Sequence, residues 1–124
     1  MNLLEQLREM TVVVADTGDL KAIEECKPQD ATTNPSLITA AAQMPEYQGI
    51  VDETLSGARE TLGSTAAATE VVTLAFDRLA VSFGLKILDL IPGRVSTEVD
   101  ARLSYDTEAT ITKGREIIAQ YETA

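Results

Sequence analysis

Three short segments of this sequence have the composition of buried strands, and each is followed by a helical pattern. Thr11 to Ala15 is rich in β-branched residues, Asp30 to Thr33 is shorter, and Arg94 to Val99 alternates apolar and polar side chains. Because strands joined by helical connections pair in parallel with right-handed crossovers, this order predicts an α/β fold. No repeat or linker divides the chain, so we expect residues 1–124 to form a single unit.

Local signals indicate where several helices begin and end. Glutamates and an arginine among leucines predict a short amphipathic helix near the amino terminus. Asn34 before Pro35 is typical of a helix start, two helices are expected up to Gly63, and Asp106 is expected to cap a helix that runs to the end of the sequence. Gly84 is expected to break the long helical segment that precedes the third strand.

Composition excludes several classes of function. The chain has 10 Lys+Arg against 20 Asp+Glu and a net charge of −10, which disfavours binding to nucleic acid or to an anionic membrane. It has no histidine, which excludes a Ser-His-Asp triad, a Cys-His dyad and any zinc site with a histidine ligand, and we expect no metal. The single Cys26 cannot form an internal disulfide. No apolar run approaches the ~20 residues that span a bilayer, so we expect a soluble protein of the reducing cytoplasm.

Polar side chains gather where the expected strands end. Asp16 closes the first strand, Thr32 and Asn34 close the second, and Ser96 and Glu98 lie in the third. In parallel α/β folds the carboxyl ends of the strands carry the chemistry. Two carboxylates in one pocket shift each other's pKa and can divide acid from base work, and an asparagine suits sugar hydroxyls.

Each of these side chains also has a purely structural alternative. Asp16 and Asn34 can cap the helices that follow them, and Glu98 can pair with Arg94 or Arg102. Because caps and ion pairs are common, the strand-end residues alone leave both interpretations open.

Three motifs resemble the amino-terminal signatures of transaldolases, in that family's order and spacing. They are Thr11-Val-Val-Val-Ala-Asp16-Thr-Gly-Asp19, Asp30-Ala-Thr-Thr-Asn-Pro-Ser-Leu-Ile38 and Ile91-Pro-Gly-Arg-Val-Ser-Thr-Glu-Val-Asp-Ala-Arg-Leu-Ser-Tyr-Asp106. The resemblance covers nearly the whole chain. It implies a (β/α)8 TIM-type barrel and a transferase of the pentose phosphate pathway that needs no cofactor. Such an enzyme moves a dihydroxyacetone unit from sedoheptulose 7-phosphate to glyceraldehyde 3-phosphate through a lysine Schiff base.

The resemblance also implies a role for each strand-end residue. Asp16 matches the general acid and base that handles the proton of the sugar hydroxyl. Glu98 matches a carboxylate that works through a water molecule while the Schiff base forms, and Thr32 matches a residue that helps to place that water. Asn34 and Ser96 match residues that orient the bound dihydroxyacetone unit.

The sequence is shorter than such a barrel requires. A barrel of this type takes ~250 residues, so 124 residues with about three parallel strands are expected to form a partial TIM-type barrel that this chain alone does not close. The resemblance places the Schiff-base lysine on a fourth strand and a phosphate-binding arginine later still, outside this sequence. The four lysines that are present all fall on expected helices or their ends: Lys21, Lys27, Lys86 and Lys113.

Two hypotheses follow. In the first, the chain is the amino-terminal part of a transaldolase, inactive alone, and its substrates are the sugar phosphates of the whole enzyme. In the second, it is a non-catalytic binding or assembly module derived from a transaldolase. In either case the open strand edges lead us to expect self-association or pairing with the missing part of the barrel.

Overall fold

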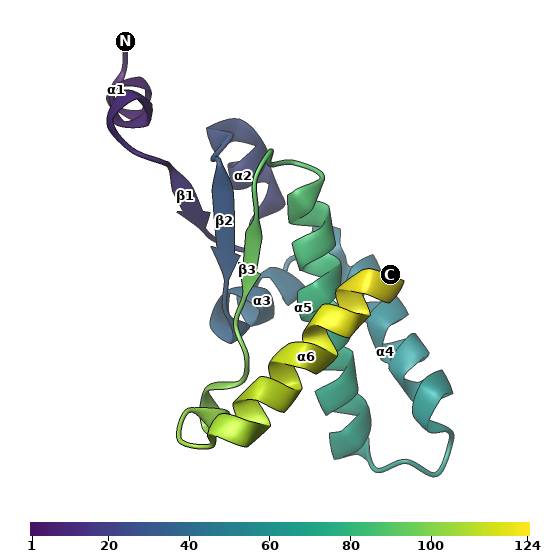
Figure 1. Cartoon of the computed structure of the whole chain (residues 1–124). Coiled ribbons are helices and arrows are strands. Elements are labelled where there is room, and N and C mark those ends of the chain that lie inside the picture. Colours follow the sequence, from purple (N-terminus) through teal and green to yellow (C-terminus); the bar gives the residue numbers. More distant parts are fainter.

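The computed structural model describes residues 1–124 and contains one sheet of three parallel strands (Figure 1). The strands are β1 (Val14–Asp16), β2 (Asp30–Thr33) and β3 (Val95–Thr97), and they lie side by side in that order. β2 is therefore the central strand, and both of its neighbours are parallel to it. This arrangement confirms the predicted α/β class.

Six α-helices and two short 3-10 helices precede, connect and follow the strands. They are α1 (Leu3–Met10), α2 (Leu20–Cys26), α3 (Pro35–Ala42), η1 (Pro45–Tyr47), α4 (Gln48–Leu62), α5 (Ala68–Leu88), η2 (Ala101–Leu103) and α6 (Thr107–Thr123). α2 joins β1 to β2, the segments from α3 to α5 join β2 to β3, and η2 and α6 follow β3. The predicted helix start at Pro35 and the cap of α6 by Asp106 are both confirmed.

The central strand limits the length of the outer two. β1 begins at Val14 instead of Thr11, because β2 begins only at Asp30 and gives the earlier residues no strand to pair with. β3 ends at Thr97 instead of Val99, because the chain turns into α3 directly after Thr33. The sequence therefore predicted too long a strand at the amino end of β1 and at the carboxyl end of β3, where β2 offers no residues to pair with.

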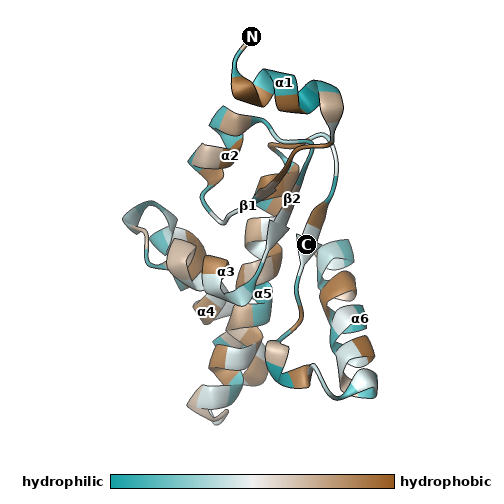
Figure 2. Cartoon of the chain, turned by 90° about the vertical axis from the view of Figure 1, so that its left-hand side faces the viewer, coloured by the Kyte–Doolittle hydropathy of each residue, from teal (hydrophilic) through white to brown (hydrophobic).

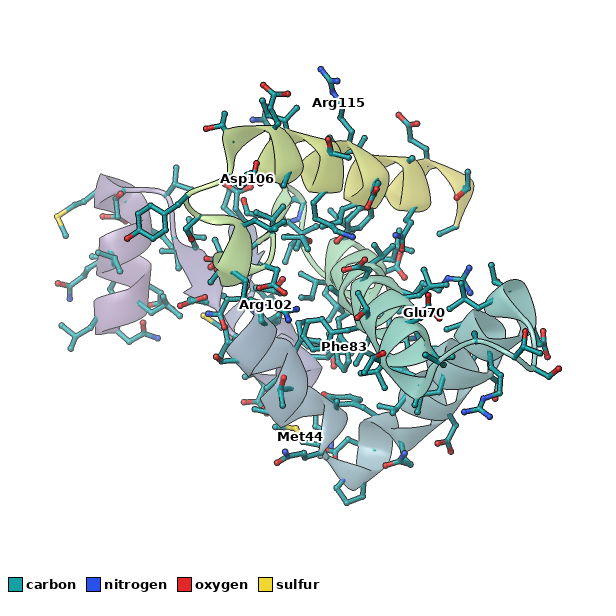
Figure 3. All side chains as sticks on the ribbon, turned by 90° about the horizontal axis from the view of Figure 1, so that it is seen from below. Met44, Glu70, Phe83, Arg102, Asp106 and Arg115 are labelled. Atoms are coloured by element: carbon teal, nitrogen blue, oxygen red, sulfur yellow. The ribbon has the colours of Figure 1, made fainter.

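One face of the sheet packs against α2 and α5. Ala31 and Thr33 of β2 are buried on this face, and Ala31 packs with Ile23 of α2 and Ile87 of α5. A second cluster joins α3, η1 and α5 around the fully buried Phe83. The rings of Phe83 and Tyr47 pack edge to face, with their centroids 5.4 Å apart. Phe83 lies among the helices in Figure 3, whereas Arg115 on α6 points away from the body. The opposite face of the sheet has no helix packed on its centre.

Helix α5 continues through Gly84, so the predicted break at this glycine was wrong. Gly84 allows α5 and α6 to come close together, because a Cβ atom at this position would lie 1.7 Å from the hydroxyl oxygen of Tyr121 on α6. That hydroxyl is 2.6 Å from Oγ1 of Thr97 on β3, and the pair forms a hydrogen bond. One tyrosine thus joins α5, α6 and the carboxyl end of β3.

The predicted amphipathic helix at the amino terminus is confirmed as α1, and it lies near the edge of the molecule (Figures 1 and 2). None of its residues is buried, and Arg8 attaches it to the body by donating hydrogen bonds to the carbonyl oxygens of Cys26 and Lys27. Across the whole structure, every helix lacks the combination of length and apolar character that crossing a bilayer would require.

Candidate active site

Asp16, Thr32 and Ser96 occupy one row across the three strands. The register pairs Asp16 with Thr32 and Thr32 with Ser96. Since side chains alternate along a strand, residues paired in register project from the same face, and neighbouring strands are about 4.8 Å apart. This face is opposite to the one that α2 and α5 cover, and it leaves Asp16 and Ser96 exposed. The structure therefore brings three of the five predicted site residues together.

A hydrogen bond between strands fixes the Asp16 carboxylate. Thr32 Oγ1 donates to Asp16 Oδ1 at 2.8 Å, while Asp16 Oδ2 accepts no hydrogen bond from the protein. The cap of α2 is Asp19, which accepts from the backbone N–H groups of Lys21 and Ala22 at 3.0 and 3.3 Å. The alternative that Asp16 caps this helix is therefore wrong, and one of its oxygens is available to an external group.

Gly18 holds the loop after Asp16 against α3. It is buried, and a Cβ atom there would lie 2.9 Å from the carbonyl oxygen of Leu37 and 3.1 Å from the Cβ of Ala41. This loop can come so close only because residue 18 lacks a side chain. The sequence marks Gly18 as part of a turn but gives no sign that it positions the neighbouring carboxylate.

Asn34 is a helix cap, as its structural alternative predicted. Its Oδ1 accepts a hydrogen bond from the backbone N–H of Leu37 at 3.0 Å, and Pro35 occupies the first helical position. The cap uses only the oxygen, so the two N–H donors of the side-chain amide have no partner in the protein. Asn34 follows Thr32 by two residues with extended backbone, which continues the alternation of the strand. Capping and ligand binding are thus compatible for this side chain.

Glu98 lies directly beyond β3, two residues after Ser96, and is exposed. The predicted alternative of an ion pair between Glu98 and Arg102 is wrong. Nε of Arg102 instead donates hydrogen bonds to both carboxylate oxygens of Asp100, at 3.0 and 2.9 Å. The hydrogen bonds and charge of Arg102 lower the pKa of Asp100 from 3.8 to about 2. Arg94 forms no ion pair either, so the Glu98 carboxylate is free of cationic partners.

No lysine lies on the open face. As predicted, all four are on helices or helix ends: Lys21 in α2, Lys27 at its C-cap, Lys86 in α5 and Lys113 in α6. Two are engaged in ion pairs, Lys21 with Glu46 at 3.1 Å and Lys113 with Asp77 at 2.9 Å and with Glu116 at 2.8 Å. Both pKa values are raised, chiefly by the hydrogen bonds to these carboxylates. A raised pKa keeps an amine protonated, which is the opposite of what a lysine nucleophile requires.

The open face therefore offers one kind of chemistry. Asp16 can take up or release a proton, and the hydroxyl of Ser96 and the amide of Asn34 can hydrogen-bond to a hydroxylated ligand. No three acidic or sulfur-bearing side chains are arranged to hold a metal ion. The face itself is exposed, and this chain supplies no amine to it.

Comparisons with known proteins agree with this chemistry. Residues 13–124 match the family described as transaldolase/fructose-6-phosphate aldolase. The chain is 76% identical over 123 residues to the transaldolase of Nostoc punctiforme and 77% identical over 123 residues to that of Methylococcus capsulatus. Each match covers 99% of this chain but only 37% of the relative. A transaldolase of Acidobacterium capsulatum is 66% identical over 121 residues, which cover 98% of this chain and 36% of that protein. The chain thus spans little more than a third of the length of these relatives.

Proposed function

Because the chain belongs to the transaldolase/fructose-6-phosphate aldolase family, we propose that it supplies the acid-base and substrate-orienting part of a transaldolase active site. The reaction transfers a dihydroxyacetone unit from sedoheptulose 7-phosphate to glyceraldehyde 3-phosphate and yields erythrose 4-phosphate and fructose 6-phosphate. The observation that carries the proposal is the row of Asp16, Thr32 and Ser96 on the open face of the sheet.

Asp16 moves the proton of the reacting hydroxyl. Cleavage of the donor requires that the hydroxyl on the leaving carbon lose its proton while the adjacent carbon–carbon bond breaks and the electron pair of that bond passes to the Schiff base. Addition to the acceptor aldehyde reverses both transfers, so the proton returns to the new hydroxyl. Oδ2 of Asp16 is the oxygen free to do this, and the hydrogen bond from Thr32 to Oδ1 keeps it in place.

The remaining site residues orient the substrate and a water molecule. The amide N–H groups of Asn34 and the hydroxyl of Ser96 hydrogen-bond to oxygens of the dihydroxyacetone unit, while the Oδ1 of Asn34 remains occupied by the cap of α3. Glu98, with no cationic partner, takes a proton from the attacking amine through a bridging water and returns it to the hydroxyl that leaves as the Schiff base forms. Thr32 helps to place the bridging water. The Schiff-base lysine belongs to a part of the enzyme outside this sequence, and the isolated chain is inactive.

The reaction belongs to the pentose phosphate pathway in the cytoplasm. One feature supports this location: the lone cysteine, Cys26, is a free thiol.

A chimera tests the proposal directly. The 123 matched residues of the Nostoc punctiforme transaldolase are replaced by the corresponding residues of this chain, and turnover of fructose 6-phosphate with erythrose 4-phosphate is measured in a coupled assay. We expect activity within tenfold of the parent. Asp16→Asn in the chimera is expected to lower kcat by about 10²–10⁴-fold, the usual contribution of a general acid or base.

Two controls keep the result specific. Asp19→Asn replaces the carboxylate that caps α2, three residues away, by another good cap, and should leave kcat unchanged. The isolated chain, treated with fructose 6-phosphate and borohydride, should show no sugar adduct by mass spectrometry. A folded chimera without turnover, full activity of Asp16→Asn, or an adduct on any lysine of the isolated chain would each contradict the proposal.

A further inference from the structure

We propose that Tyr121 is a positioning residue of the active site, and that it acts through its hydrogen bond to Thr97 at the carboxyl end of β3. Thr97 lies between Ser96 and Glu98 in the chain, so this bond holds the backbone that carries both site residues. The role rests on the proposed function, since it concerns how two of the residues assigned there are held.

Ser96 and Glu98 differ from the other site residues in how they are fixed. The Asp16 carboxylate accepts a hydrogen bond from Thr32, and the Asn34 side chain caps α3. The Ser96 hydroxyl and the Glu98 carboxylate are exposed, and neither forms a hydrogen bond to another protein group. The positions of these two side chains therefore depend on the backbone of β3 and of the residue that follows it.

Thr97 links this backbone to the helices. Because side chains alternate along a strand, the Thr97 side chain projects away from the open face on which Ser96 lies. Its Oγ1 is 2.6 Å from the hydroxyl oxygen of Tyr121 on α6. The residue paired with Thr97 in register is Thr33, which is buried and whose Oγ1 has no hydrogen-bond partner. Tyr121, and not a contact at Thr33, thus anchors this end of the sheet to a helix by a side-chain hydrogen bond.

Gly84 leaves room for the Tyr121 hydroxyl. A Cβ atom at residue 84 would lie 1.7 Å from the hydroxyl oxygen and 2.7 Å from Cζ, so the oxygen demands the absence of a side chain more strongly than the ring does. A glycine inside a helix is less favourable than an alanine, so α5 gives up helix stability where this hydroxyl passes. Burial raises the pKa of the Tyr121 phenol, which keeps the group protonated and able to share its hydrogen bond with Thr97.

The anchored backbone matters most while the Schiff base forms. Glu98 exchanges a proton through a bridging water, and such a transfer depends on hydrogen-bonding distance. A displacement of about 1 Å can cost about 10²-fold in rate, and loss of one anchor without a change of fold costs less. We therefore expect Tyr121→Phe to slow formation of the Schiff base about three- to tenfold. Proton transfer by Asp16 should change little, because Thr32 holds this carboxylate independently.

Trapping of the Schiff base in the chimera tests the proposal. The chimera is mixed with saturating fructose 6-phosphate, borohydride is added at successive times, and the reduced adduct is followed by mass spectrometry. Tyr121→Phe and Thr97→Val each remove the hydrogen bond and should both slow adduct formation about three- to tenfold. Thr97→Ser keeps a hydroxyl and should form the adduct at the rate of the unmodified chimera.

Tyr47→Phe is the matched control. Tyr47 is a buried tyrosine whose hydroxyl accepts a hydrogen bond from the backbone N–H of Leu20 at 3.1 Å, so the change also removes one hydrogen bond from a packed tyrosine. We expect Tyr47→Phe to lower thermal stability to a similar extent as Tyr121→Phe and to leave the rate of adduct formation unchanged. Equal slowing by the two changes would overturn the proposal, because it would trace the effect of Tyr121→Phe to stability alone.

Double variants show which side chain Tyr121 positions. In a Glu98→Gln chimera, Tyr121→Phe should change the rate of adduct formation by less than about twofold, because the carboxylate that depends on the anchor is gone. In an Asp16→Asn chimera, the full slowing by Tyr121→Phe should remain. Slowing that is as large with Glu98→Gln as without it would overturn the assignment.

Hydrogen exchange separates this proposal from the proposed function. Exchange of the backbone amides is measured by mass spectrometry on the peptide that contains β3, and Tyr121→Phe should speed this exchange whereas Tyr47→Phe should not. A folded chimera that lacks turnover but shows this difference contradicts the proposed function and supports the anchor. An active chimera in which Tyr121→Phe alters neither exchange nor adduct formation supports the function and overturns the positioning role.

Discussion

Replacement of Gly84 by alanine tests the contact that joins α5, α6 and β3. Alanine is the better helix former by about 1 kcal/mol, so the change would stabilise an unconstrained helix. At Gly84 the new Cβ would lie 1.7 Å from Oη and 2.7 Å from Cζ of Tyr121. Both distances are far below van der Waals contact, and the phenol group of Tyr121 cannot move away without losing its hydrogen bond to Thr97.

The magnitude follows from three effects. The gain in helix propensity is about 1 kcal/mol. Loss of the hydrogen bond between Tyr121 and Thr97 costs about 1 kcal/mol, and forcing extra volume into a packed site costs about 1–3 kcal/mol. Gly84→Ala is therefore expected to lower the free energy of unfolding by about 1–3 kcal/mol.

Urea denaturation followed by far-ultraviolet circular dichroism measures this change. Gly114→Ala in α6 is the matched control, because a Cβ atom there meets nothing within 4 Å. The control should stabilise the chain by about 1 kcal/mol. The critical result is that Gly84→Ala lowers the free energy of unfolding whereas Gly114→Ala raises it.

A double mutant identifies Tyr121 as the cause. Tyr121→Phe removes the atom closest to the new Cβ, so its combination with Gly84→Ala should cost less than the sum of the two single changes. If Gly84→Ala is as stable as Gly114→Ala, or if the two costs simply add, the reasoning about this contact is refuted.

Two further predictions concern single side chains near the site. In the chimera, Asn34→Ala removes the cap of α3 and should lower the free energy of unfolding by about 1 kcal/mol. Asn34→Asp keeps the capping oxygen but loses the amide donors, so it should retain stability while raising KM or lowering kcat. Thermal unfolding and steady-state kinetics measure the two effects, and loss of stability without loss of activity in Asn34→Asp would show that Asn34 serves only as a cap. The pKa of Asp100 is lowered to about 2 by Arg102, so the stability from this pair is present above pH 3.8, the ordinary value, and is lost as the pH falls toward 2. In an NMR titration, Arg102→Gln should move the midpoint of the Asp100 carboxyl up toward 3.8, and an unchanged midpoint would contradict the assigned cause.

Local signals predicted the central strand and the helix caps. β2 has the predicted bounds, Asp30 to Thr33, and Asn34 with Pro35 starts α3 as expected, because caps and proline act over a few residues of the chain. Pairing of residues far apart decided the rest. β1 and β3 are as long as their contact with β2 allows, and no pattern within either segment contains that limit.

For the site, alternation along each strand determined which residues share a face, and the register determined which become neighbours. The sequence by itself placed Asp16 and Thr32 at strand ends and Ser96 within the third strand, and it indicated that no lysine ends a strand. Only the tertiary structure set Thr32 against Asp16, left Glu98 without a cationic partner, and made Gly84 and Gly18 points of close approach. The physical reason is that hydrogen-bonding distance and packing depend on elements brought together by folding, whereas caps, turns and periodicity depend on adjacent residues.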